Sequence, residues 1–252
     1  MKKLAALNVF GGWLVLIVAL GLLSGPAQAY VYDDFAGTGI NPILWVDRGP
    51  DYGLFSQPGD GNLYFSDPSG GKKDSLRSSS SWNMPFFVSL QYTDLLADNP
   101  GPPPGPPIDF SGSSVNLWIG YTDNIVAVYE CKWGNGYYFR AAKTVNGVAT
   151  PLIDLIPTTV NSGWLGINYD GAQVSVMYDD GSGSGWHEIA RIDSFFTSDP
   201  YFAVRGYNPY GNWLNFKVEQ VQFNPVPLPA GVWLLGSGLL GLMGLGRIFK
   251  RN

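Results

Sequence analysis

Apolar and polar residues alternate along much of the stretch between residues 30 and 225, and no long run has the 3.6-residue period of a helix. Alternation with a period of two predicts β-strands that bury one face. After Val218 the apolar positions shift to Val221 and Phe223, which predicts a β-bulge near Gln220. The clearest predicted buried faces are Phe86-Val88-Leu90-Tyr92, Val115-Leu117-Ile119-Tyr121, Ile125-Ala127-Tyr129-Cys131-Trp133 and Leu214-Phe216-Val218.

Two short motifs predict that consecutive strands pair as antiparallel hairpins. Asp170-Gly171 is typical of a two-residue turn, which would place Ile167 opposite Val174. Asn146-Gly147 predicts a second turn of the same kind.

The segment Gly134-Asn135-Gly136 suits a three-residue hairpin loop. With that loop length, Cys131 would face Phe139 on the buried side, and Glu130 would face Arg140 on the other side. We therefore expect a cross-strand ion pair between Glu130 and Arg140, which would hold the pKa of Glu130 low.

Composition and charge narrow the class of protein. The 252 residues carry a formal net charge of −5, and only 14% of them are charged, against about 25% in average soluble proteins. One cysteine excludes an intrachain disulfide framework. Between residues 30 and 225, ten basic residues stand against twenty acidic ones, so nucleic acid is not an expected partner. The predicted fold class is all-β, an antiparallel β-sandwich or jelly roll over residues 30–225.

Residues 1–29 have the layout of a secretory signal peptide. Two lysines near the start precede an apolar stretch over residues 4–23, which the helix-breaking Ser24-Gly25-Pro26 follows. Ala27 and Ala29 form a small-x-small cleavage site, so we expect signal peptidase to cut after Ala29 and the chain to be exported across the inner membrane. The alternative is an uncleaved membrane anchor.

Residues 226–252 predict a C-terminal transmembrane helix. The nineteen residues from Gly231 to Phe249 would reach about 28 Å as a helix, close to the hydrocarbon thickness of a bilayer. A buried core helix is the alternative, but the glycines of this run would destabilise it by about 1 kcal/mol each. Basic residues at the end would hold it at the cytoplasmic side: Arg247, Lys250 and Arg251.

This C-terminal segment resembles the PEP-CTERM type of bacterial sorting signal in its VPLPA form. The motif consists of Val226, Pro227, Leu228, Pro229 and Ala230, followed by the short apolar span and the basic residues. The resemblance implies an exosortase, a membrane peptidase or transpeptidase, as partner, and transient insertion of the helix into the inner membrane. It also implies a Gram-negative bacterium that makes extracellular polysaccharide, with the processed protein at the cell surface or in the extracellular matrix. The segment departs from the commoner form because Leu228 stands where a glutamate is usual.

The stretch between the two ends resembles concanavalin-A-like lectin and glucanase domains. The likeness begins at Tyr32-Asp33-Asp34-Phe35 and Asn41-Pro42-Ile43-Leu44-Trp45, and the later strands also resemble laminin-G-like domains. The resemblance implies a carbohydrate ligand, and it suggests calcium near Asp33 or Asp34 as an option. Turn chemistry explains the Asp-Gly segments without a metal, so no cofactor is otherwise expected.

Catalytic motifs are sparse in this sequence. Glucanases of the resembled type carry two acidic residues closely spaced on one strand, but none of Glu130, Glu188 and Glu219 has an acidic neighbour two or four residues away. A nucleophilic pair of Cys131 and His187 is disfavoured because Cys131 is predicted to be buried. We expect no catalytic residue, while a polysaccharide hydrolase or lyase remains the alternative.

Carbohydrate binding is the function that the pattern favours. Trp118 and Asn116 lie on the strand face opposite Leu117, and Tyr138 and Arg140 lie on the face opposite Phe139. Aromatic rings stack on sugar rings, and the polar groups can bind hydroxyls. We therefore expect these four residues to form an exposed platform for extracellular polysaccharide. Two alternatives stay open: that loops cover this face, and that the protein is a purely structural matrix or coat component.

Overall fold

The computed structural model describes residues 30–98, 112–121, 123–153, 155–209 and 212–225. The predicted signal peptide over residues 1–29 and the predicted sorting segment over residues 226–252 lie outside these ranges. Within the described ranges, no helix is both long enough and apolar enough to cross a membrane. Residues 29–224 form one compact unit.

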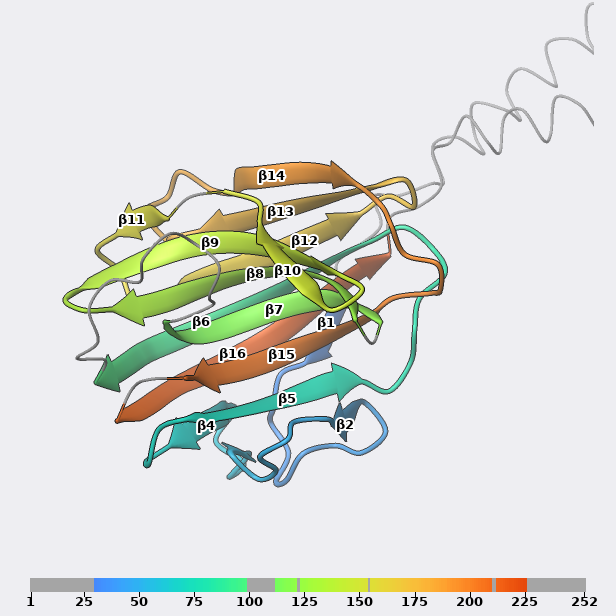
Figure 1. The fold of residues 1–252 in the computed structure, drawn as a ribbon. Helices are drawn as coiled ribbons and strands as arrows, with labels where there is room; N and C mark the ends of the chain where they lie inside the picture. The colour runs from blue at the N-terminus through green and yellow to red at the C-terminus, as the bar shows by residue number, and fades with distance from the viewer. Residues whose placement is uncertain (1–29, 99–111, 122, 154, 210–211, 226–252) are drawn as a thin grey trace, which may run out of the picture. The chain divides into compact units, whose positions relative to one another are not determined.

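Two antiparallel sheets pack face to face, with sheet B toward the viewer in Figure 1. The predicted class, an all-β antiparallel sandwich, is confirmed. In sheet A, the strand order is β14 (His187–Asp193), β13 (Gln173–Asp179), β12 (Gly163–Tyr169), β6 (Phe86–Asp98), β16 (Trp213–Pro225), β4 (Leu63–Asp67) and β3 (Phe55–Ser56), and β1 (Tyr30–Asp33) also pairs with β16. In sheet B, the order is β10 (Val148–Pro151), β9 (Gly136–Val145), β8 (Asn124–Trp133), β7 (Ser113–Tyr121), β15 (Tyr201–Asn208), β5 (Lys72–Ser78) and β2 (Trp45–Asp47), and β11 (Ile156–Thr158) also pairs with β9.

The hydrophobic core lies between the two sheets. The alternating residues predicted for β6 and for β7 up to Ile119 point into it and are fully buried. Aromatic rings fill much of the space; Phe65 and Phe216, for example, stack with centroids 4.9 Å apart. On β16, Val218 and Val221 are both buried while the two residues between them are partly exposed, so the predicted slip of the apolar pattern is confirmed.

Of the two predicted two-residue turns, only Asn146-Gly147 has the predicted length. Val145 pairs with Val148 around it, and both turn residues have positive φ, at 50° and 79°. At Asp170-Gly171, Tyr169 pairs with Val174 and Ile167 pairs with Val176, so the predicted register is wrong by two residues. The Asp170 carboxylate accepts the N–H groups of Ala172 and Gln173, at 2.8 and 2.6 Å, and this stabilises a wider loop. A shift of two keeps every side chain on its predicted face.

The register predicted for β8 and β9 is wrong by one residue. Gly134-Asn135 forms a two-residue turn, so Trp133 pairs with Gly136, Cys131 with Tyr138, and Glu130 with Phe139. Glu130 therefore shares the inner face with Val126 and Val128, while the predicted buried series of β8 lies on the outside. The pattern was ambiguous because apolar residues occupy both faces of β8 and both faces are buried along much of its length.

Candidate functional site

Four residues singled out in the sequence lie together on the outer face of sheet B, the face turned away from sheet A. Asn116 on β7 aligns across β8 with Arg140 on β9, since Tyr129 pairs with both. Trp118 and Tyr138 lie one row to either side of this line. The structure thus assembles the predicted set from two strands.

The expected exposure of this set is wrong for three of its members. Trp118 is 6% exposed, Asn116 7% and Arg140 5%, whereas Tyr138 is partly exposed. On this side, Leu155 packs against a small cluster of Tyr129, Cys131 and Ala142. The outer face is therefore packed, not open, at β8 and β9.

The neighbouring strands β15 and β5 add cationic residues that the sequence reasoning missed. Arg205 on β15 lies in line with Asn116 on β7 and Ser75 on β5. Its guanidinium carbon is 5.6 Å from the centroid of the Trp118 ring, and the guanidinium carbon of Arg77 is 4.0 Å from the Tyr201 ring. The outward position of Arg205 could have been predicted from the alternation of β15, because the apolar Phe202 and Val204 alternate with positions 203 and 205.

A pocket of about 400 Å³ opens beside Arg205. The turn at residues 49–50 forms part of its wall, and Tyr52 is 71% exposed. We name this feature the cationic pocket; its side chains come from Arg48, Tyr52, Lys73, Asp74, Ser75 and Arg205.

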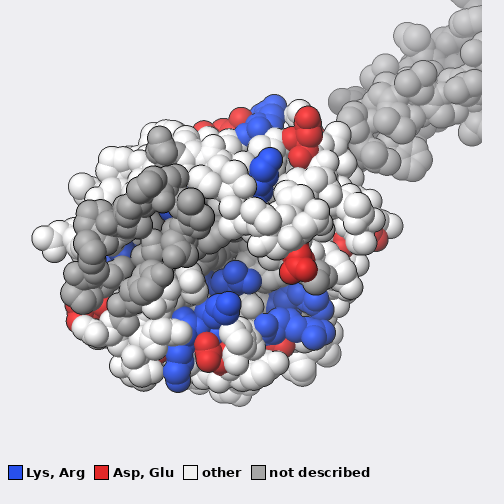
Figure 2. Space-filling model, in the orientation of Figure 1, with Lys and Arg blue, Asp and Glu red and all other residues white. Residues whose placement is uncertain are grey.

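Positive charge is concentrated around this pocket. Figure 2 shows lysine and arginine side chains gathered over β5 and β15, with a few acidic side chains beside them. Within the described part of the chain, no ion pair joins Arg48, Lys73, Arg77 or Arg205 to a carboxylate. Burial lowers the pKa of Arg205 from its usual value.

Asp74, the carboxylate that lines the pocket, is committed to the backbone. Its two oxygens accept the N–H groups of Ser75 at 2.7 Å and Leu54 at 3.1 Å. Burial is the main cause that raises the pKa of Asp74 to about 6, followed by the nearby charge of Asp47. Asp74 therefore shapes the loop at the pocket and is not a partner of the cations.

Two buried N–H groups on the same face have no acceptor among the described residues. They are the indole Nε1 of Trp118 and the Nε of Arg77. A buried donor without an acceptor costs about 1–3 kcal/mol. Such donors are better satisfied by a bound polar ligand than by the free protein.

Glu130 lies in the core between the sheets, so the predicted ion pair with Arg140 is wrong. Glu130 is fully buried and accepts a hydrogen bond from the Tyr92 hydroxyl of β6. Burial raises the pKa of Glu130 to about 8, and the hydrogen bond from Tyr92, which lowers this pKa, offsets only part of the rise. A raised pKa is typical of catalytic acids, but here the carboxyl group is out of reach of a substrate.

Cys131 and His187 do not form a catalytic pair. Cys131 lies on β8 of sheet B, where burial raises the pKa of its thiol to about 12. His187 lies on β14 of sheet A, stacks on Tyr178 and is 3.0 Å from the Ser184 hydroxyl.

Asp33 and Asp34 do not fit a calcium site in this structure. Both carboxylate oxygens of Asp33 accept internal hydrogen bonds, from the Phe35 N–H at 2.9 Å and the Trp45 indole at 2.7 Å. Asp34 accepts the Ala36 N–H. Calcium needs six to eight oxygen ligands, and the residues described contain no group of three or more His, Cys, Asp or Glu side chains arranged for a metal. Asp33 instead fixes Trp45 in the core.

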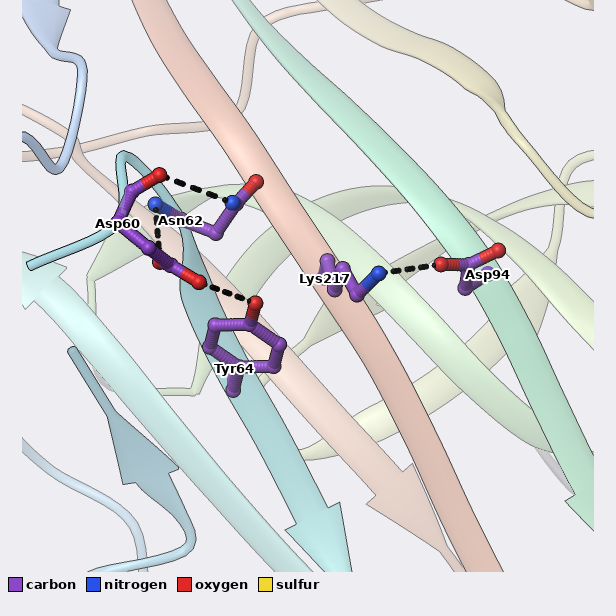
Figure 3. A network of polar contacts seen from close by, with 5 residues as sticks. All are labelled: Asp60, Asn62, Tyr64, Asp94 and Lys217. Carbon is purple, nitrogen blue, oxygen red and sulfur yellow. Dashed lines mark hydrogen bonds and ion pairs between the residues drawn. The ribbon is translucent and has the colours of Figure 1, made fainter. Parts of the chain in front are cut away.

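An exposed polar network lies on sheet A (Figure 3). The Asp60 carboxylate accepts a hydrogen bond from the Tyr64 hydroxyl at 2.6 Å, which lowers the pKa of Asp60. Lys217 forms a 2.6 Å ion pair with Asp94. An ionised, hydrogen-bonded Asp60 is a poor proton donor, so this network is a solvated surface feature.

Comparison with known proteins shows a likeness of fold. No protein-family model matches the chain, and no curated protein matches it in sequence. The exoplasmic/lumenal domain of VIP36, in a form bound to Ca²⁺ and Man3GlcNAc, superposes with a TM-score of 0.57 at 12% identity, covering 80% of this chain and 92% of that domain. The GH43 protein BlXynB of Bacillus licheniformis gives a TM-score of 0.56 at 12% identity over 77% of this chain, which spans only 39% of BlXynB. A Saccharomyces cerevisiae protein of unknown function gives 0.56 at 10% identity.

These identities are too low to transfer a function. Both a sugar-bound domain and a glycoside hydrolase superpose on the same sandwich, so the likeness does not decide between binding and hydrolysis. The comparisons therefore show a β-sandwich fold like that of these structures.

Proposed function

We propose that the protein is an exported, non-catalytic carbohydrate-binding β-sandwich that contacts extracellular polysaccharide through the cationic pocket. The pocket carries the proposal because its volume of about 400 Å³ lies within the range of small-ligand sites, about 300–1,000 Å³. The exposed Tyr52 ring offers a face on which a sugar can stack, and Arg48, Lys73, Ser75 and Arg205 offer donors for its oxygens.

Binding is favoured over hydrolysis by the placement of the carboxylates. Glycosidases need two carboxyl groups about 5–9 Å apart beside the sugar. On the described strands, the outward positions of β5, β7, β8, β9 and β15 carry no aspartate or glutamate, and Glu130 points into the core. The pocket itself has Asp74 in its lining and Asp47 near it, but both oxygens of Asp74 accept backbone N–H groups.

Export and sorting follow from the two ends of the sequence. The apolar stretch with Ala27 and Ala29 supports cleavage by signal peptidase, and the VPLPA-type motif from Val226 to Ala230 supports recognition by an exosortase. We expect mass spectrometry of protein recovered from the medium or cell surface to lack residues 1–29 and the apolar C-terminal run. Full-length protein in the inner membrane would contradict this part of the proposal.

A glycan-array screen of the full chain in mild detergent tests the binding function. We expect binding to at least one polysaccharide, weakened about fivefold by Tyr52→Ala because a lost stacking contact is worth about 1 kcal/mol. Trp213→Ala, at an exposed ring on β16, is the control and should bind normally. Release of new reducing ends would favour the hydrolase alternative, and the absence of binding to any saccharide would favour a structural matrix protein.

A further inference from the structure

The cationic pocket also indicates the chemical class of its ligand, an inference that rests on the proposed carbohydrate binding. We propose that the polysaccharide is anionic and carries carboxylate groups, which Arg205, Lys73 and Arg48 bind as ion pairs.

The main observation is that Arg205 is partly buried and has no carboxylate partner among the described residues. Its side chain is partly buried on the outer face of sheet B, between Ser75 and Asn116. The amide nitrogen of Asn116 is 3.4 Å from the Arg205 carbonyl oxygen and 3.0 Å from the Ser114 hydroxyl, so this amide binds backbone and hydroxyl and gives the guanidinium no negative charge. A charge withdrawn from water is unfavourable unless a counter-ion lies beside it. A planar carboxylate is the group that a guanidinium binds best, with two parallel hydrogen bonds.

The buried Trp118 beside Arg205 is a second, independent observation. Its indole Nε1 is a donor without an acceptor in the described structure, although only 6% of the residue is exposed. The ring lies 5.6 Å from the guanidinium carbon of Arg205. An oxygen-rich anion entering beside Arg205 would meet hydrogen-bond donors, while Asp74, the carboxylate that lines the pocket, already accepts two backbone N–H groups.

The distribution of charge over the domain points the same way. Ten basic residues stand against twenty acidic ones between residues 30 and 225, yet four of the ten gather here: Arg48, Lys73, Arg77 and Arg205. Net negative charge elsewhere repels a polyanion, so binding would be confined to this surface. A nonspecific polyanion binder would instead show a basic balance over the whole domain.

The spacing of the cations favours a polymer over a single sugar. Lys73 and Arg77 point to the same side of β5 and are four residues apart, which corresponds to about 13 Å along the strand. Lys73 lines the pocket, whereas Arg77 lies beyond it over Tyr201. A charged chain lying along β5 would contact both cations.

The main comparison of the test is between polygalacturonate and its fully methyl-esterified form, which has the same sugar chain without the carboxylate charges. The full chain in mild non-ionic detergent is titrated with polygalacturonate, with its fully methyl-esterified form, with dextran sulfate and with duplex DNA, and binding is measured by calorimetry. We expect polygalacturonate to bind at least tenfold more tightly than the methyl ester and than DNA, with an affinity that falls as salt is added.

Three variants assign the effect to the pocket. Arg205→Gln and Lys73→Gln should each weaken polygalacturonate binding about tenfold, while Arg191→Gln, which removes an exposed charge on β14 of sheet A, should not. Lys73 is exposed, so its variant folds even if Arg205→Gln does not.

Each remaining outcome has a distinct meaning. Equal binding of polygalacturonate and its methyl ester overturns the anionic inference and leaves carbohydrate binding intact. Tight binding of dextran sulfate or DNA, equal to that of polygalacturonate, also overturns it, because the surface then recognises charge alone. Absence of binding to every saccharide overturns the proposed function and this inference together.

Discussion

Replacing the buried Glu130 by glutamine should change how the stability of the protein depends on pH. In the folded protein, the pKa of Glu130 is raised to about 8, mainly by burial, whereas the unperturbed value is 4.5. Between these values the folded protein keeps the proton and the unfolded chain has lost it. Because the folded state then binds more protons, the stability of the wild type falls as pH rises through this window. Glutamine does not titrate, so the variant lacks this fall.

The size of the effect follows from the two pKa values. With 4.5 in the unfolded chain and about 8 in the folded one, linkage gives a loss of about 3–4 kcal/mol in the wild type between pH 5 and pH 8. The glutamine side chain can still accept the Tyr92 hydroxyl but adds an N–H group to the core, a pH-independent penalty of about 1–3 kcal/mol. Asp74, whose pKa is raised to about 6, weakens both proteins alike between pH 4 and pH 6. The difference between the two proteins therefore isolates Glu130.

Urea unfolding followed by tryptophan fluorescence at pH 5, 6, 7 and 8 measures this difference. We expect the stability of Glu130→Gln relative to the wild type to rise steadily with pH. Tyr92→Phe is the matched control, because it removes the hydrogen bond that lowers the pKa of Glu130 and should move the end of the window above pH 8. Parallel stability curves for wild type and Glu130→Gln would refute the reasoning.

Three further predictions concern packing, surface charge and thiol reactivity. Gly206→Ala should lower the unfolding free energy by about 1–3 kcal/mol, because the new methyl group would collide with the Phe65 ring, which is held in a stack with Phe216. Gly37→Ala is the control, because that position has room for a Cβ. An unchanged urea midpoint for Gly206→Ala would contradict the packing. Lys217→Gln removes an exposed ion pair to Asp94 and should leave the urea midpoint within experimental error; a clear loss would mean that the pair is less hydrated than the structure indicates. The Cys131 thiol is buried, and its pKa is raised to about 12 from 9.0. It should therefore hold about a thousandfold less thiolate than an ordinary cysteine and react with a disulfide reagent only after denaturation. Fast reaction of the native protein would place the thiol at the surface.

Local patterns of apolar and polar residues were enough to predict the fold class and most inward faces. Alternation predicted the core sides of β6 and β7 because their outward residues are mostly polar or small enough to break the apolar run. Asn146-Gly147 predicted its turn because both residues tolerate positive φ. Alternation also placed Trp118 and Asn116, and separately Tyr138 and Arg140, on shared faces, and the structure confirms both placements.

The inward face of β8, the burial of the predicted platform and the position of the pocket depend on how distant strands pack together. Where both faces of a strand are apolar, periodicity cannot tell which of them meets the other sheet, so the alternation of β8 predicts the wrong side for Glu130. The cationic pocket depends on strand order: β15 lies between β7 and β5, so Arg205 meets residues distant in the chain, Ser75 and Asn116. A local pattern records which side chains of one strand share a face. It does not record which strands become neighbours, because long-range packing of the two sheets selects that order.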